Sequence, residues 1–271
     1  MQVNNINKTD LTCFNSGISN TDLRKLKTIL PSSTEKYFID KYGIKANFSE
    51  NQTISILNLL CRNILDRLKK TKLFDILPIN TNPSSIRVFN CNELTKPYPD
   101  NFCTTKTKQI IKNESPYKPI SLFFVNDKFD LEEIEEMVRK AKRNNFISND
   151  NFLGFTMHEW MHIVHLNYLY KKNNFNEQHF ANEIKRIKKI YLNNREKSII
   201  RECLGEYAYN GGNTNQMEVV AEGLNKIICS CLNDNEVGIS SNPEDVINSL
   251  PKELILILMK IINCNDARYG L

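Results

Sequence analysis

The sequence predicts a helix-rich α+β fold for this chain of 271 residues. Two runs in the middle of the chain have the composition of strands. Residues 85–90 alternate in the manner of a strand, and Ile120 to Val125 is a nearly continuous apolar run that ends at Asn126. Almost everything after Phe152 has helical patterning. We therefore expect a small sheet ahead of a helical second half.

The first 80 residues predict a separate, helical N-terminal unit, to which the sequence assigns no role. Short helices are expected over 21–30 and 33–42, divided by Pro31 and closed by Gly43. A third helix begins at the capping pattern Ser49-Glu50-Asn51-Gln52 and carries apolar residues at helical spacing. We expect two domains, residues 1–80 and residues 81–271.

The helices of the second domain follow from capping and charge signals. The segment 131–145 has acidic residues in its first turns and basic residues in its last turn, which matches the helix dipole. Further helices are predicted over 153–172, 178–193, 196–210, 215–232 and 243–263. A polar connection, 91–118, precedes them. Cys91 and Cys103 flank one irregular loop within this connection and form the one cysteine pair that we consider for a disulfide.

Composition and charge exclude several classes of protein. The net charge is only +5, and the basic runs lie in separate predicted helices, so we do not expect a nucleic-acid partner. No apolar run reaches the roughly 20 residues that span a bilayer, so no membrane span is expected. The segment Met1 to Asn5 has no feature of a signal peptide. We expect a cytoplasmic location or export by a non-classical route.

The most informative stretch is the pattern H-E-x-x-H formed by His158, Glu159 and His162. Two imidazoles four residues apart lie on one face of a helix, at the separation that a single tetrahedral zinc ion accepts. The glutamate between them can reach a water molecule on the metal. The chain has only four histidines, three of them within eight residues, so a chance pattern is improbable. The sequence therefore predicts a zinc site.

A zinc ion needs a third protein ligand, and the sequence offers an acidic pair for it. The metzincin continuation is excluded, because His165 and Tyr168 stand where that pattern requires Gly and His. Glu218 and Glu222 lie four residues apart in a largely apolar helix. One of them can bind zinc while the other accepts a hydrogen bond from a ligand histidine. The alternative is that both are solvent-facing glutamates. His165 is too far along its helix to bind the same ion.

These motifs together resemble the zincins related to the anthrax lethal factor catalytic domain, which include the clostridial Pro-Pro endopeptidases and phage-borne zincin-like domains. The resemblance is carried by the H-E-x-x-H helix and by two later segments, Gly205-Glu206-Tyr207-Ala208 and Thr214 to Glu222. It covers roughly residues 85–230. It implies a zincin-type metallopeptidase with a small sheet ahead of the metal helix.

The resemblance also implies roles for individual residues. His158, His162 and Glu218 would bind Zn²⁺, Glu159 would be the catalytic base, and Glu222 would support a ligand histidine. Tyr207 would stabilise the oxyanion, although the inserted segment 210–213 leaves Tyr209 as a competitor.

Such enzymes hold a protein or peptide substrate in an extended conformation beside a strand. We expect the strand 120–125 in this role, with Leu122, Phe123 and Phe124 in contact with the substrate.

The expected function is a zinc-dependent endopeptidase acting on a protein substrate, in keeping with a family that is rich in delivered effectors and toxins. The alternative is a zincin-like structural or interaction module, of the kind associated with phage heads, without catalysis. Intact His158, Glu159, His162 and Tyr207 favour the enzyme.

Overall fold

A computed structural model describes thirteen stretches of the chain. They are residues 31–43, 45–47, 65–66, 68–69, 73–77, 84–89, 103–107, 121–126, 131–148, 152–173, 177–214, 216–231 and 243–263. The helices predicted over 21–30 and after Ser49 lie wholly or largely outside these residues, as does Cys91, so the disulfide considered between Cys91 and Cys103 stays a prediction.

Nine helices lie in the described part of the chain, and those of the second half agree closely with the sequence prediction. They are α3 (Pro31–Tyr42), α5 (Leu73–Ile76), α6 (Leu131–Arg143), α7 (Phe152–Asn173), α8 (Glu177–Leu192), α9 (Asn194–Thr214), α10 (Gln216–Cys231), α11 (Pro243–Ser249) and α12 (Lys252–Ile262). One difference concerns the C-terminal segment, which was expected as a single helix. Pro251 divides it into α11 and α12, because proline lacks an N–H and disfavours helix at the preceding residue.

The backbone also contains a four-stranded sheet with the order β1-β2-β4-β3. Its strands are β1 (Lys45–Asn47), β2 (Ser84–Phe89), β3 (Cys103–Thr107) and β4 (Ser121–Asn126). The pairs β1–β2 and β2–β4 are parallel, whereas β3 runs antiparallel to β4. Strands β2 and β4 were expected within one residue of these bounds. Strand β3 lies in the segment that was expected to be an irregular connection.

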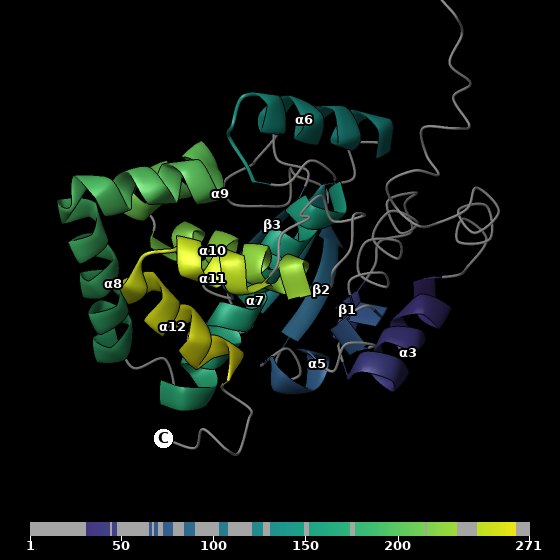
Figure 1. Cartoon of the computed structure of the whole chain (residues 1–271). Coiled ribbons are helices and arrows are strands. Elements are labelled where there is room, and N and C mark those ends of the chain that lie inside the picture. Colours follow the sequence, from purple (N-terminus) through teal and green to yellow (C-terminus); the bar gives the residue numbers. More distant parts are fainter. Residues whose placement is uncertain are drawn as a thin grey trace, which may run out of the picture.

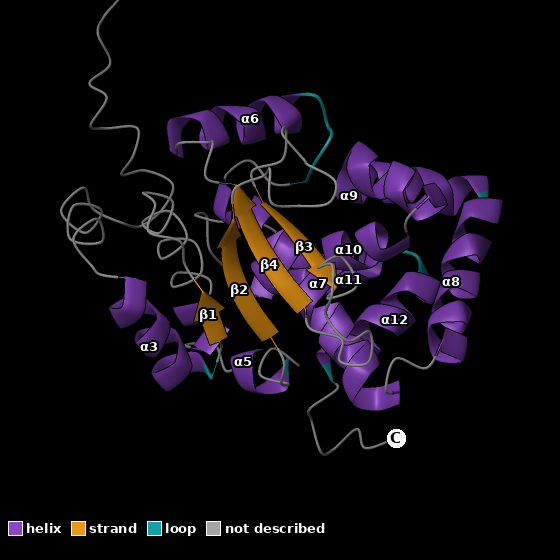
Figure 2. Cartoon of the chain, turned by 180° about the vertical axis from the view of Figure 1, so that it is seen from behind, coloured by secondary structure: helices purple, strands orange, loops and turns teal. Residues whose placement is uncertain are grey.

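The helix that carries the H-E-x-x-H pattern lies at the centre of the structure. Helix α7 contacts β3 and β4 of the sheet and also α10, so it lies between the sheet and a layer of helices (Figures 1 and 2). Every side chain described from Gly154 to Leu169 is buried except that of Phe155. Because α7 is enclosed all round, its polar residues lie inside the protein and need partners there.

The predicted fold class requires a correction. Of the residues whose side chains the structure describes, 90% are helical and none lies in a strand, so the part that holds the site is helical and an α+β zincin class is not supported. The helical N-terminal unit expected over residues 1–80 stays a prediction, although this part of the chain also contains one strand. Strand β1 lies within residues 1–80 and pairs with β2, which begins at Ser84, across the boundary expected near residue 80. The prediction relied on two strand-like runs and therefore overestimated the contribution of the sheet to the fold class.

The proposed substrate strand is a second correction. Strand β4 pairs with β2 along one side and with β3 along the other. The backbone groups of Leu122, Phe123 and Phe124 are therefore already paired, and β4 offers no free edge for an added peptide strand.

No helix in the described part of the chain combines the length and apolar character that crossing a membrane requires.

Candidate metal centre

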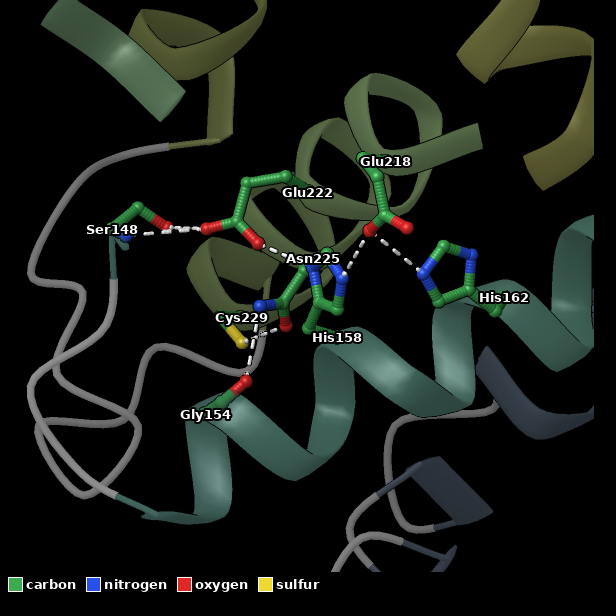
Figure 3. Close-up of polar contacts among 8 residues, drawn as sticks. All are labelled: Ser148, Gly154, His158, His162, Glu218, Glu222, Asn225 and Cys229. Carbon is green, nitrogen blue, oxygen red and sulfur yellow. Dashed lines mark hydrogen bonds and ion pairs between the residues drawn. The ribbon is translucent and has the colours of Figure 1, made fainter. Parts of the chain in front are cut away.

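Helices α7 and α10 pack face to face and bring the predicted ligands together (Figure 3). His158 and His162 project from successive turns of α7, and Glu218 projects toward them from the first turn of α10. The Oε2 atom of Glu218 lies 3.2 Å from Nε2 of His158 and 3.1 Å from Nε2 of His162. The ligand atoms of all three residues lie within 4.8 Å of one another.

These distances fit a tetrahedral zinc site. Zinc lies about 2.0–2.1 Å from imidazole nitrogen and carboxylate oxygen, so neighbouring ligand atoms of a tetrahedron are about 3.3 Å apart. The two nitrogen-to-oxygen separations in the site are close to that value. The donor set of two imidazoles and one carboxylate is also one that catalytic zinc sites use, with a fourth position left for water or substrate. The residues present therefore suit zinc.

Glu222 lies one turn after Glu218 and supports His158 from behind. The Nδ1–H group of His158 donates to Oε2 of Glu222 at 2.5 Å, which leaves Nε2 directed toward Glu218 (Figure 3). Only 1% of Glu222 and 3% of His158 are exposed. A carboxylate in this position fixes the tautomer and the orientation of a metal-binding imidazole.

The other oxygen of Glu222 is held by a residue that the sequence did not single out. Both the backbone N–H group and the hydroxyl group of Ser148 donate to Oε1 of Glu222, the former at 3.2 Å. Ser148 follows α6 and is 74 residues from Glu222 in the sequence. A serine in a turn-rich segment carries no sequence signal for such a contact, so only the structure could reveal it.

The charges at the site influence one another strongly in the metal-free protein. Burial alone would lower the pKa of His158, but hydrogen bonds to Glu218 and Glu222 outweigh burial and raise it well above its usual value. Burial alone would raise the pKa of Glu218. The charge of His162 and the hydrogen bonds from both histidines outweigh this effect and hold the pKa of Glu218 well below its usual range. The site therefore holds ionised carboxylates beside protonated imidazole. A bound cation can take the place of the imidazole proton.

Tyr207, and not Tyr209, is the tyrosine at this site. The ring of Tyr207 lies 5.7 Å from the ring of His158. Burial, followed by the charges of Glu218 and Glu159, raises the pKa of the Tyr207 phenol well above its usual value, so the phenol stays protonated and can donate. Tyr209 instead packs against Tyr191 and lies beneath the side chains of Lys197 and Arg201.

Glu159 and His165 take different environments on α7. Glu159 is 8% exposed and close enough to Tyr207 for its charge to affect the phenol. His165 is fully buried and pairs through Nε2 with Oε2 of Glu183 on α8, at 2.9 Å. The expectation that His165 does not bind the same ion agrees with these contacts.

Two further contacts keep α10 in register with α7 and α9. The amide of Asn225 donates to the backbone oxygen of Gly154 at 3.0 Å, which joins α10 to the start of α7 (Figure 3). Gly211 lies against the side chain of Glu218, where an added Cβ would overlap Cβ of Glu218 and lie 2.7 Å from its Cγ. The glycine in the inserted segment 210–213 thus makes room for the third predicted ligand.

No protein-family model, curated protein or solved structure gives a significant match to this chain. The resemblance to the lethal-factor-related zincins therefore stays a prediction from the sequence, and the functional argument depends on the geometry of the site.

Proposed function

We propose that the protein is a zinc-dependent endopeptidase, with His158, His162 and Glu218 as the zinc ligands. The observation that carries this proposal is the convergence of ligand atoms from two buried histidines and a partly buried glutamate, on two helices that are far apart in the sequence. A chance H-E-x-x-H pattern gives no reason for a glutamate 56 residues later to face both imidazoles. The hydrogen bond from His158 to Glu222 adds the support that metal-binding histidines usually have.

A zinc ion in such a site supplies Lewis acidity, which polarises a carbonyl group and activates water for attack. The protein's own residues then have distinct tasks. Glu159 lies between the two histidines in the sequence and takes the proton of the attacking water. It returns that proton to the amine nitrogen as the carbon–nitrogen bond of the peptide breaks. No other group is required to balance the reaction.

Tyr207 completes the set as a hydrogen-bond donor. Attack on the carbonyl carbon places negative charge on the carbonyl oxygen, and a donor that is already in place stabilises that charge. The raised pKa of Tyr207 keeps its phenol protonated over the physiological pH range. The burial of the surrounding residues limits competition from water, so a single donor has a large effect.

The test is cleavage of a diverse peptide library by the zinc-loaded protein, with the products identified by mass spectrometry. We expect cleavage at a restricted set of peptide bonds, loss of cleavage after chelation, and recovery when one equivalent of zinc is restored. Absence of any cleavage by a folded, zinc-loaded protein would contradict the proposal and would favour a structural metal.

A further inference from the structure

We propose that the five residues Asn144 to Ser148, here called the site loop, are a positioning element that holds Glu222 and Tyr207 in place at once. The site loop follows α6, and Ser148 at its end lies beside Glu222 of α10 (Figure 3). This inference rests on the proposed function, because it assigns the loop a task in binding zinc and in stabilising the oxyanion.

The first arm of the site loop acts on the metal ligands through Glu222. Ser148 places two donors on a single oxygen of Glu222, and the other oxygen accepts the Nδ1–H group of His158. Ser148 is 9% exposed, so water competes little for these hydrogen bonds. Lys142 donates to the backbone oxygen of Ser148 at 2.8 Å and joins this end of the loop to α6. The orientation of His158 therefore depends on the loop.

The second arm acts on Tyr207 through the backbone. Gly205 has φ 89° and ψ 171°, which interrupts α9 two residues before Tyr207. Beyond the break, the N–H groups of Glu206 and Tyr207 donate to the backbone oxygens of Asn145 and Phe146, both at 2.8 Å. The backbone of Tyr207 is thus hydrogen-bonded to the site loop.

The interruption of α9 is supported on its other side as well. In an unbroken helix the N–H group of Tyr207 would donate to the carbonyl group of Cys203, four residues earlier. Lys226 of α10 donates to that carbonyl oxygen instead. Because the freed backbone group has a partner, the break is a stable part of the fold and costs little.

Only glycine fits at position 205. A φ of +89° is strained for residues with a side chain. An added Cβ would also lie 3.0 Å from the backbone oxygen of Phe146 and 3.2 Å from the carbonyl carbon of Ile147. The close approach between α9 and the site loop therefore requires a residue without a side chain at position 205. The ring of Phe146, 5.3 Å from that of Tyr207, closes the contact.

The contact with Glu222 and the contact with Tyr207 lead to separate predictions. A loop that only stabilised the fold would not affect zinc affinity and kcat separately. Ser148→Ala should lower zinc affinity about 10-fold or more, the range seen when the support of a ligand histidine is lost. Ser148→Thr, which keeps the hydroxyl group, should restore it. Gly205→Ala should lower kcat by up to about 100-fold through displacement of Tyr207, with KM and zinc affinity close to wild type.

The experiment measures zinc affinity and steady-state kinetics for these variants and for two double variants. In a Glu222→Gln background, Ser148→Ala should lower zinc affinity little further. In a Tyr207→Phe background, Gly205→Ala should lower kcat little further. The reason is that the effects of two residues are not additive when one acts through the other. Ser230→Ala is the matched control. It removes a buried hydroxyl from the same helix as Glu222, where the hydroxyl bonds the oxygen of Ile227, and should leave zinc affinity unchanged.

Unchanged zinc affinity in a folded Ser148→Ala protein would overturn the proposal, as would additive losses in either double variant. The zinc measurement needs no peptide cleavage. It therefore decides whether the loop holds Glu222 even if the wild-type protein cleaves nothing, an outcome that would contradict the proposed function and the loop's task at Tyr207. If Gly205→Ala does not fold, the Ser148 series can still overturn the proposal, because the proposal requires both contacts.

Discussion

Glu159 is the residue whose replacement separates catalysis from metal binding. It lies on α7 between His158 and His162, and its charge affects the phenol of Tyr207. Glu159→Gln keeps the size of the side chain but removes its basicity. We expect peptide cleavage to fall by about 10²–10⁴-fold, the usual contribution of a general base, with zinc content unchanged. Cleavage rates and zinc content of the two proteins, measured in parallel, test this.

The matched control for that variant is Glu183→Gln. Glu183 is also buried, at 6% exposure, but it pairs with His165 on the side of α7 that faces α8. We expect its replacement to lower the melting temperature and to leave kcat nearly unchanged. Equal losses of activity in the two variants would show that burial of a carboxylate, and not proton transfer, is the property that matters.

Tyr207 should act only when the oxyanion forms. We expect Tyr207→Phe to lower kcat by about 10²–10³-fold with a smaller effect on KM, as loss of one oxyanion donor does in other hydrolases. Tyr209→Phe is the control, because Tyr209 packs against Tyr191 away from His158. Steady-state kinetics on one peptide substrate decide between them. A fully active Tyr207→Phe protein would exclude this role.

Zinc binding should release protons near neutral pH. The pKa of His158 is raised in the metal-free protein, so this imidazole carries a proton that zinc must displace. Zinc affinity should therefore rise with pH from about pH 6 to 8, by about tenfold per pH unit for each proton released. Calorimetry in buffers of different ionisation enthalpy measures the release. Affinity that does not change over this range would contradict the protonated state of His158.

At the scale of elements, the contact between the end of α9 and the start of α10 sets the position of Glu218. Gly211 has no room for a side chain beside Glu218. We expect Gly211→Ala to displace that carboxylate and to lower zinc affinity at least about tenfold, while the helices persist because alanine favours helix. Asn210→Ala, at the exposed neighbouring residue, is the control. Zinc titration of both variants tests this, and equal affinities would contradict it.

The helices could be predicted from the sequence because their signals are local. The bounds expected for α7, α8 and α10 differ from the structure by one residue at each end. Strand β3 could not be predicted, because Cys103 to Thr107 has no apolar alternation and is defined by its pairing with β4. The break at Gly205 was missed for the same kind of reason, since it depends on hydrogen bonds to Asn145 and Phe146.

The same distinction applies to the whole molecule. The spacing of His158 and His162 predicts a metal site from one helix alone. The pair Glu218 and Glu222 could be selected because the sequence offers few acidic pairs on apolar helices, and the resemblance then favoured Glu218 as the ligand. Ser148 could not, because nothing local shows that it meets Glu222. The fold class was wrong because two strand-like runs say nothing about how much of the molecule is helical or how β1 joins the sheet.

Zinc should stabilise the whole protein by mass action. A ligand at 1,000 times its dissociation constant adds about 4 kcal/mol to the free energy of unfolding, which corresponds to roughly 10 °C for a chain of this size. We expect Glu159→Gln to keep this shift and His162→Ala to lose it. Melting curves with zinc and with chelator test the difference. A shift of equal size in His162→Ala would place the zinc elsewhere.

The number of zinc ions bound per chain tests the central claim most directly, in the purified wild-type protein and in Glu218→Ala. The geometry of His158, His162 and Glu218 predicts one zinc ion per wild-type chain, removable by chelator and restored by one equivalent. It predicts a large loss of affinity in Glu218→Ala, with the fold retained. A folded wild-type protein that takes up no zinc, or a Glu218→Ala protein that binds zinc as tightly as wild type, would contradict it.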